Sequence, residues 1–287
     1  MAAGTFFVSL RLADRLFLAY NAVVVLLVLV TYARQPLAPW ILAVHCGLVA
    51  AALLLIRIDS GRGLTRVLRV WYPALAFVWV YMEAGLLRHG LFPEDLDPLL
   101  LRAELLVFGI ELYRELPPLL GTLGLEVIHF FYFTYYVLLY VPGLLAMPYK
   151  PRLVREYVFT ISLCMFSLCL FFMLFPSDGP KQYRAHPVYD GYLFIPLMNL
   201  IYGNVDQGGG AFPSAHSAQA VLVALFARLF FPAWRYLFYF LAVMILVSTI
   251  LCSYHYAIDT AAGAALGFAF YWLGRRLYRA YGADDEA

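Results

Sequence analysis

The sequence contains few charged residues. Only 13% of its 287 residues are Asp, Glu, Lys or Arg, whereas 64% are hydrophobic. An average soluble domain is about 25% charged and about 45–50% apolar. Too few charged side chains are present to cover a water-soluble surface around this much apolar material. The same composition excludes intrinsic disorder and a nucleic-acid-binding protein. We therefore expect an integral membrane protein.

The sequence also lacks the cysteine spacing of a disulfide framework or a zinc site. Its four cysteines lie in apolar runs, and none belongs to a CxxC pair. Cysteines in such surroundings usually pack as small hydrophobic side chains. We expect no disulfide, no metal site and no cofactor. The cysteines are Cys46, Cys164, Cys169 and Cys252.

Long apolar runs dominate the chain. A helix needs about 20 mostly apolar residues to cross a hydrocarbon core about 30 Å thick. The sequence therefore predicts an all-α fold, a polytopic membrane bundle of about eight spans. The segment 97–116 carries acids and arginines at helical spacing among leucines, which predicts an amphipathic helix at the membrane interface. The predicted spans cover about 16–33, 38–56, 67–87, 124–147, 157–175, 213–231, 235–252 and 255–274.

The basic residues predict the orientation of this bundle. If the N-terminus is cytoplasmic, 14 of the 20 Lys and Arg residues lie on the cytoplasmic side, as the positive-inside rule requires. The long loop 176–212 then faces the opposite side. The Ala-, Leu- and Arg-rich composition suits a bacterial inner membrane with this loop in the periplasm. The six basic residues expected outside are Arg34, Arg88, Arg102, Arg114, Lys181 and Arg184.

Chemically active residues occur in three segments on the predicted outer side. The first, SDGPKQYR, contains Lys181 and Arg184. The second, AFPSAHSAQA, opens a predicted span and places His216 in its first turn. The N-terminus of a helix offers unpaired N–H groups, such as that of Ala215, to an anion, and Ser214 adds a hydroxyl. We expect Lys181, Arg184, Ser214 and Ala215 to bind a phosphate group.

The third segment, STILCSYHYAIDTAAG, places His255 and Asp259 four residues apart, on one face of a helix. Asp259 can fix the tautomer of His255 and stabilise its charged form, as the carboxylate of a catalytic triad does. A histidine held in this way can attack phosphorus and carry a phosphoryl group. His216 would protonate the departing alcohol oxygen. This scheme requires no metal ion.

The two histidine motifs resemble those of the type 2 phosphatidic acid phosphatase superfamily. The histidine of PSAH is followed 39 residues later by the histidine of HYAID. The resemblance covers about residues 95–272. It implies a helical bundle with its active site at the extracytoplasmic interface, a phosphohistidine intermediate on His255 and a lipid phosphate substrate. It also implies that His216 is the general acid and Asp259 the partner of His255.

Two departures from the superfamily motifs resemble the inositol phosphorylceramide synthase branch. Ser248 takes the serine position of the third motif, but Thr249 stands where its arginine usually stands. Val188 stands seven residues after Lys181, where the first motif has an arginine. The segments FPSDGPK, AFPSAHS and HYAIDTAAG also look like that branch. Arg184 is our candidate for the role of the missing arginine.

The resemblance leads to an expected domain organisation. We expect N-terminal transmembrane helices at 1–95, a catalytic membrane core at 96–275 and a cytoplasmic tail at 276–287. The substrate would be a lipid phosphate ester, and the acceptor stays open. Water as acceptor makes the protein a lipid phosphatase that releases inorganic phosphate, whereas a lipid or sugar alcohol makes it a phosphotransferase. The missing arginine favours the transferase, and the sequence does not indicate an oligomeric state.

Ionisable and polar residues in the predicted spans allow two further interpretations. Glu126 and His129, with Tyr132 and Tyr136, are candidates for a headgroup pocket. The Glu-x-x-His spacing would suit a metal, but di-iron bundles need two such pairs. A proton-coupled lipid transporter could use Glu83, Glu126 and His129 as a relay. Transporters bind substrate near the midplane and usually contain repeats, and neither feature is seen in the sequence. We therefore favour an enzyme.

Overall fold

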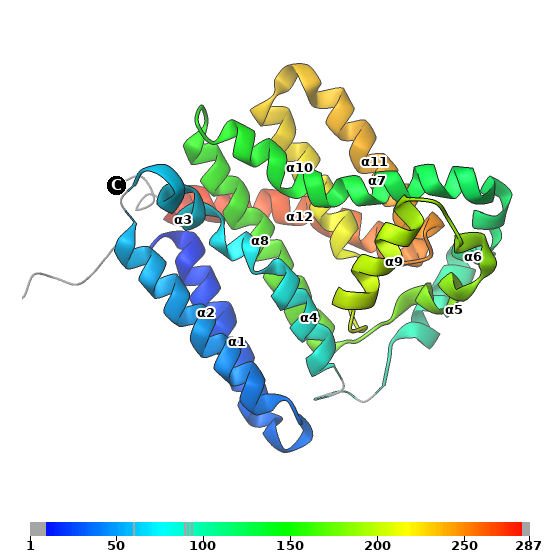
Figure 1. The fold of residues 1–287 in the computed structure, drawn as a ribbon, viewed down its shortest axis with the longest axis horizontal. Coiled ribbons are helices and arrows are strands. Elements are labelled where there is room, and N and C mark those ends of the chain that lie inside the picture. Colours follow the sequence, from blue (N-terminus) through cyan, green and yellow to red (C-terminus); the bar gives the residue numbers. More distant parts are fainter. Residues whose placement is uncertain (1–9, 60, 89, 91, 93, 283–287) are drawn as a thin grey trace, which may run out of the picture.

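The computed structural model describes residues 10–59, 61–88, 90, 92 and 94–282. These parts of the chain form helices joined by turns and loops, with one isolated parallel bridge between Ser177 and Gly210 (Figure 1). The α-helices are α1 (Leu12–Val30), α2 (Ala38–Ile58), α3 (Gly63–Leu75), α4 (Phe77–Leu87), α5 (Asp97–Phe108), α6 (Leu112–Glu115), α7 (Pro117–Ala146), α8 (Pro151–Leu174), α9 (Phe194–Val205), α10 (Ala215–Phe230), α11 (Arg235–Leu251) and α12 (Ala257–Tyr281). Four short 3₁₀ helices are η1 (Tyr32–Arg34), η2 (Gly179–Ala185), η3 (Pro187–Tyr189) and η4 (Pro232–Trp234).

Among the residues that the structure describes, six helical segments are long and apolar enough to cross a membrane, which indicates an integral membrane protein. The predicted count of about eight spans is not confirmed. Helix α10 is largely apolar, but its 16 residues cover only about 24 Å, which is less than the core thickness of about 30 Å. Helix α12 is longer but contains more polar and small residues. The six segments are Leu12–Val30, Ala38–Ile58, Gly63–Leu87, Pro117–Ala146, Pro151–Leu174 and Pro232–Leu251.

The predicted amphipathic helix at 97–116 is two helices in the structure. Helix α5 ends where Gly109 adopts a left-handed conformation with φ of 73°, and the N–H of Gly109 donates to the Leu105 carbonyl. A glycine in this conformation is a common helix terminator. The chain then turns before the single turn of α6.

The expected tail at 276–287 begins as helix, because α12 continues to Tyr281, and residues 283–287 lie outside the described residues.

Helix α8 forms the centre of the bundle. It packs against α1, α3 and α4 on one side and against α10 and α12 on the other (Figure 1). In its most apolar stretch 72% of the residues are buried, compared with 22% in α2. Helix α8 therefore joins the N-terminal helices to the part of the bundle that carries the two histidine motifs.

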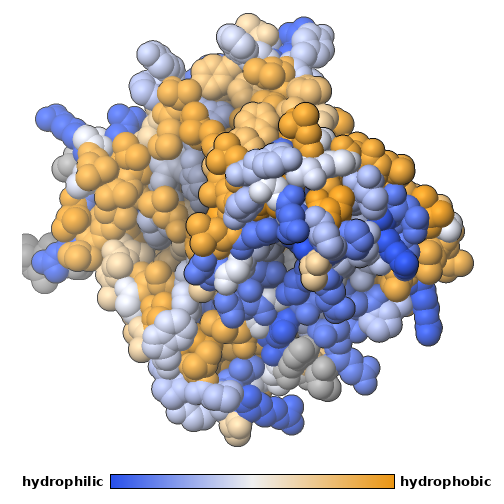
Figure 2. Space-filling model, turned by 45° about the vertical axis from the view of Figure 1, so that its right-hand side comes forward, coloured by the Kyte–Doolittle hydropathy of each residue, from blue (hydrophilic) through white to orange (hydrophobic). Residues whose placement is uncertain are grey.

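On one side of the molecule, hydrophilic side chains gather in one area bordered by hydrophobic surface (Figure 2).

A buried polar network fixes α4 to the first two helices. The Tyr20 hydroxyl donates to the Glu83 carboxylate at 2.6 Å, and His45 Nε2 lies 2.9 Å from the same carboxylate. His45 Nδ1 donates to the Asn21 side chain at 2.8 Å. All four side chains are nearly inaccessible to solvent. Two residues after Glu83, Gly85 packs so closely on Gln207 that a Cβ would lie 2.7 Å from the Gln207 Cβ. The network therefore positions the surface of α4 that supports the 206–210 loop.

Replacement of Glu83 by alanine should destabilise the protein. The substitution leaves His45 and Tyr20 without their buried partner, and breaking a buried charged pair typically costs about 3 kcal/mol. We expect Glu83→Ala to unfold at a clearly lower temperature than the wild type in detergent micelles. Glu115→Ala, at an exposed position at the end of α6, is the control and should melt like the wild type. Equal melting temperatures for both variants would contradict this role of the network.

Candidate active site

Three segments that are distant in the sequence meet at Gly179. This residue has φ of 67°, and a Cβ there would lie 2.9 Å from both the Ala211 side chain and the Tyr254 carbonyl oxygen. Only glycine tolerates both the backbone conformation and the close approach. Backbone hydrogen bonds join Ser177 to Gly209 and Ala211 at 3.1 and 2.9 Å. The structure thus brings together the three segments that the sequence analysis selected.

The N-termini of α10 and α12 touch each other. Ser214 is the N-cap of α10, and its hydroxyl accepts a hydrogen bond from the Ser217 N–H at 3.2 Å. The Ser214 N–H donates to the Asp259 carbonyl at 3.0 Å. A Cβ on Gly263 would overlap the Ser214 carbonyl group, so the approach requires glycine. As a result the rings of His216 and His255 lie 5.8 Å apart, centroid to centroid.

The hydrogen bonds of His255 define its tautomer. Its Nδ1 lies 2.9 Å from the Ala211 carbonyl oxygen. A carbonyl oxygen can only accept, so Nδ1 carries the proton and Nε2 of the neutral ring carries a lone pair. No described residue forms a hydrogen bond with Nε2. His255 is 4% exposed and lines a small cavity of about 10 Å³, which is room for about one water molecule.

Asp259 lies close to His255 but is held by the backbone of its own helix. One carboxylate oxygen accepts a hydrogen bond from the Tyr256 N–H at 2.9 Å and lies 3.7 Å from His255 Nδ1. The other oxygen is buried without a hydrogen-bond partner. The predicted contact thus exists as an ion pair, but the prediction that both residues lie on one face of a helix is wrong, because His255 precedes Tyr256, the N-cap of α12. The Ala211 carbonyl makes the shorter contact with Nδ1. Burial raises the pKa of the Asp259 carboxyl to about 6, although the contact with His255 opposes this effect.

His216 is surrounded by tyrosine rings. Tyr132 and Tyr135 lie 5.0 and 4.5 Å from it, and Tyr136 lies 6.2 Å away, measured between ring centroids. No described residue forms a hydrogen bond with either ring nitrogen of His216. The side chain lines a second cavity, of about 240 Å³, which Ala215 and Tyr136 also line. Each histidine of the pair therefore faces a different cavity.

Lys181 lines the cavity that contains His255, and Arg88, which was not predicted as a site residue, is linked to it through Asp178. Lys181 Nζ lies between the carboxylates of Asp206 and Asp178, at 3.3 and 3.5 Å. Arg88 Nη1 donates to Asp178 at 2.5 Å. Burial raises the pKa of Asp178, but the Gly209 N–H, Lys181 and Arg88 outweigh this effect and hold the pKa below its usual value. Arg88 is one of only six basic residues on the predicted outer side. This scarcity was the feature of the sequence that could have identified Arg88 as a site residue.

Arg184 does not line the cavity that contains His255. Its guanidinium lies 4.1 Å from the centroid of the Tyr254 ring and donates to the Cys252 carbonyl. It also contacts Asn199 and lies 3.1 Å from His129 Nε2. The Tyr254 ring itself does line the cavity. Arg184 therefore supports the wall of the cavity, and its role as a phosphate ligand stays a prediction.

The four predicted headgroup residues have different environments. Glu126 accepts hydrogen bonds from the Leu193 and Phe194 N–H groups at 2.9 and 2.7 Å and so caps the N-terminus of α9. His129 donates from Nδ1 to the Leu125 carbonyl and accepts from Arg184. The Tyr132 hydroxyl contacts that of Tyr202. Of the four, Tyr136 lines the cavity beside His216.

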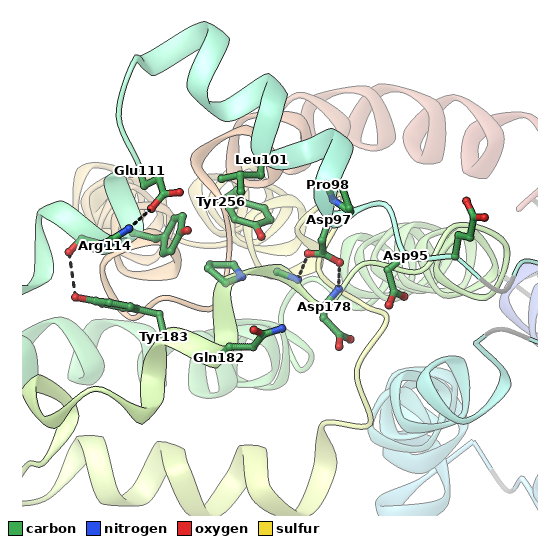
Figure 3. A pocket seen from close by; sticks show the side chains of 14 residues that line it. Asp95, Asp97, Pro98, Leu101, Glu111, Arg114, Asp178, Gln182, Tyr183 and Tyr256 are labelled. Atoms are coloured by element: carbon green, nitrogen blue, oxygen red, sulfur yellow. Dashed lines mark hydrogen bonds and ion pairs between the residues drawn. The ribbon is translucent and has the colours of Figure 1, made fainter.

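Two acidic residues of α5 hold the site from outside, and the sequence analysis did not assign them this role. Asp97 accepts hydrogen bonds from the Asp178 and Gly179 N–H groups, both at 2.7 Å (Figure 3). Glu104 accepts from the Ala257 and Ile258 N–H groups at 3.1 and 2.9 Å, at the N-terminus of α12. Burial raises the pKa of both carboxyls, although these N–H groups oppose it. The sequence feature that could have revealed this role is the spacing of Asp97 and Glu104, which are seven residues apart and therefore lie on one face of a helix.

A further cavity is acidic and contains neither histidine of the pair. It has a volume of about 970 Å³ and opens beside Asp97 (Figure 3). An anionic group would be repelled there, so the phosphate site is not expected in this cavity. Its ionisable lining residues are Glu94, Asp95, Asp97, Glu111, Tyr113, Arg114, Asp178, Tyr183 and Tyr256.

Within the described ranges, no group of three or more His, Cys, Asp or Glu side chains is placed to hold a metal ion.

Comparison with known proteins identifies a family. A sequence model described as the PAP2 superfamily matches residues 121–273, slightly more than half of the chain, and the match includes all three converging segments. No curated protein and no solved structure matches the chain. Membership of this superfamily suggests a phosphatase or phosphotransferase that acts on lipid phosphate esters. The match does not distinguish the inositol phosphorylceramide synthase branch from the rest of the superfamily.

The contact between α10 and α12 can be tested at Gly263. In Gly263→Ala the new methyl group must push the Ser214 carbonyl away, so we expect a lower melting temperature in detergent. Gly203→Ala in α9 is the matched control, because a Cβ there meets nothing within 4 Å. An exposed Gly→Ala change inside a helix should stabilise by up to about 1 kcal/mol. If Gly263→Ala melts at or above the temperature of Gly203→Ala, the close approach is not a constraint.

Proposed function

Because this chain belongs to the PAP2 superfamily, we propose that it transfers the phosphoryl group of a lipid phosphate ester through a covalent intermediate on His255. The observation that carries the proposal is the 5.8 Å separation of the His216 and His255 rings, with a lone pair on His255 Nε2. A nucleophile and a proton donor then stand on opposite sides of one reacting group. Such an arrangement suits the in-line geometry of phosphoryl transfer.

In the first step, His255 Nε2 attacks phosphorus. The N–P bond forms as the bond from phosphorus to the lipid oxygen breaks, and protonated His216 gives its proton to that oxygen. In the second step, His216 removes the proton of the acceptor hydroxyl, whose oxygen attacks phosphorus and releases His255. The phosphoryl group thus passes from the lipid to water or to an alcohol, and both histidines return to their starting states. No step of this scheme uses a metal ion.

The surrounding charges favour the intermediate. His255 becomes positively charged when Nε2 bonds to phosphorus, because Nδ1 keeps its proton. The Ala211 carbonyl and the Asp259 carboxylate, at 2.9 and 3.7 Å from Nδ1, stabilise that charge. Lys181 supplies positive charge for the phosphate oxygens. In this role it must exchange one of its two carboxylate partners for the substrate.

The missing arginine of the third motif has two candidate replacements. Thr249, at that position, forms a hydrogen bond with the Thr260 hydroxyl at 2.7 Å. Arg184, the candidate from the sequence, contacts the outer side of the Tyr254 ring. Arg88 is linked through Asp178 to Lys181. Neither arginine lines the cavity that contains His255, whereas Lys181 does, and Arg184 stays the candidate from the sequence.

The acceptor and the side of the membrane complete the proposal. The departures in the first and third motifs support a phosphotransferase of the inositol phosphorylceramide synthase type, with a phosphatase as the alternative. The distribution of basic residues supports an active site on the extracytoplasmic side, in a bacterial inner membrane.

Replacement of the two histidines should have different effects. We expect His255→Ala to abolish turnover of every substrate. His216→Ala should slow alkyl phosphates by about 10²–10⁴-fold, because a general acid contributes this much when the leaving group is poor. It should slow p-nitrophenyl phosphate far less. The measurement is kcat on both substrates, with the exposed His186→Ala as the control. Near-wild-type turnover in His255→Ala, or equal losses on both substrates in His216→Ala, would contradict the assigned roles.

Removal of metal ions and analysis of the products test the rest of the proposal. Turnover of a labelled lipid phosphate should persist in excess EDTA, and complete loss that Mg²⁺ or Zn²⁺ restores would overturn the metal-free scheme. With ceramide or diacylglycerol present, chromatography should show transfer of label to a lipid product. Quantitative release of inorganic phosphate, whichever alcohol is present, would leave only the phosphatase.

A further inference from the structure

Three arginines from different helices meet at the end of the bundle where α8 begins. Arg11 is the N-cap of α1, Arg69 lies on α3, and Arg155 lies on the second turn of α8. Together with Ala13 and Val70 they line a cavity of about 10 Å³, which has room for about one water molecule. We call this space the arginine cavity. Helices α1, α3 and α8 pack against one another, so the cavity lies at their junction.

Two carboxylates lie beside the arginine cavity, and both have partners already. Asp14 is fully buried and forms a bidentate pair with Arg69. It also accepts hydrogen bonds from the Tyr72 hydroxyl and from the Arg11 N–H, both at 2.7 Å. Asp59 accepts a hydrogen bond from Arg11 Nη2 at 3.2 Å. These two acids therefore offset the charges of Arg69 and Arg11.

The third arginine has no such partner. Among the residues that the structure describes, none forms a hydrogen bond with Arg155 Nε or Arg11 Nη1, and both nitrogens are buried. A buried polar group normally has a hydrogen-bond partner, which can be protein, water or an ion. Because both nitrogens can only donate, the group that binds them must be an acceptor. A buried charge also needs an opposite charge nearby, so the acceptor that fits best is an anion.

The protonation of Arg11 reports an excess of positive charge at this junction. Burial and the neighbouring charges of Arg69 and Arg155 lower the pKa of Arg11, and Asp59 and Asp14 offset this effect only in part. An anion between the guanidinium groups would reverse the effect. The planar guanidinium fork matches the oxygens of a phosphate group, which an ammonium group does not.

The arginine cavity and the histidine pair lie at opposite ends of α8. Arg155 is close to the first residue of this helix, whereas Ser177, whose backbone binds Ala211 and Gly209 in the candidate active site, follows its last residue. The 24 residues of α8 extend over about 36 Å, which exceeds the hydrocarbon core of about 30 Å. The arginine cavity therefore faces the lipid headgroups of the leaflet on the other side of the membrane.

We propose that the arginine cavity binds a phosphate oxyanion, which the headgroup of an anionic lipid or free phosphate supplies. One oxygen enters the cavity and accepts hydrogen bonds from Arg11 Nη1 and Arg155 Nε. The rest of the phosphate stays outside, because the volume of about 10 Å³ admits only one water-sized group. The bound anion compensates the charge of Arg155 and ties α1 to α8. This site is separate from the reaction at His255 and does not rest on it.

The melting temperature of the full-length protein in an uncharged detergent tests this site. The probes are dioleoyl phosphatidylglycerol, inorganic phosphate, and dioleoylglycerol, which has the same acyl chains without the phosphate. Arg155→Gln removes the unpaired charge from the cavity. Its matched control is Arg152→Gln, which removes one charge from an exposed position on the same helix that does not line the cavity.

Without phosphate, Arg155→Gln should melt at or above the temperature of the wild type, because it relieves the repulsion among three guanidinium groups. At about 100 times its Kd, the phosphate probe should raise the melting temperature of the wild type and of Arg152→Gln by at least about 5 °C. Arg155→Gln should lose most of this shift. A shift with phosphatidylglycerol alone identifies a headgroup site, and a shift with inorganic phosphate as well identifies a site for the free anion.

Three results would overturn the proposal. The first is an equal shift in the wild type and in Arg155→Gln, because the phosphate would then bind elsewhere, such as beside Lys181. The second is the absence of a shift with both phosphate probes, or an equal shift with dioleoylglycerol. The third is a lower melting temperature of Arg155→Gln without phosphate, because Arg155 would then stabilise the fold without an anion.

Discussion

The close contact between the N-termini of α10 and α12 is the constraint on which the candidate site depends. Because Gly263 has no side chain, the Ser214 carbonyl can lie directly against α12, and the Ser214 N–H binds the Asp259 carbonyl. His216 lies in the first turn of α10, and His255 lies two residues before the first residue of α12. Their rings can lie 5.8 Å apart only while this contact is intact. The same contact brings two helix N-termini, with their partial positive charges, to one place.

Carboxylates hold the loops around this contact. Asp97 binds the loop that carries Asp178, Glu104 binds the start of α12, and Glu126 binds the start of α9. Each accepts hydrogen bonds from backbone N–H groups that would otherwise be unsatisfied. These acids therefore act outside the reacting cavity. Within it, Asp178 and Asp206 hold Lys181, which an anionic substrate can recruit.

The residues of the site were predictable where their relationship is local in sequence. An N-cap serine two residues before a histidine, and a histidine four residues before an aspartate, are patterns that a few residues encode. Arg88, Asp97 and Glu104 were missed because their partners lie far away in the chain, as with Glu104 and Ala257. The membrane character followed from composition. The number of spans did not, because hydropathy measures apolarity and not helix length, and α10 is apolar but short.

The central claim is that His255 carries the phosphoryl group, and mapping of the intermediate tests it most directly. The wild-type enzyme would be quenched during turnover of a lipid carrying ³²P in its phosphate and then digested, and the label would be assigned to a residue by mass spectrometry. We predict an acid-labile, base-stable phosphohistidine at His255, with no label bound to a variant that lacks this histidine. Label on another residue, or turnover without any labelled enzyme, would contradict the account.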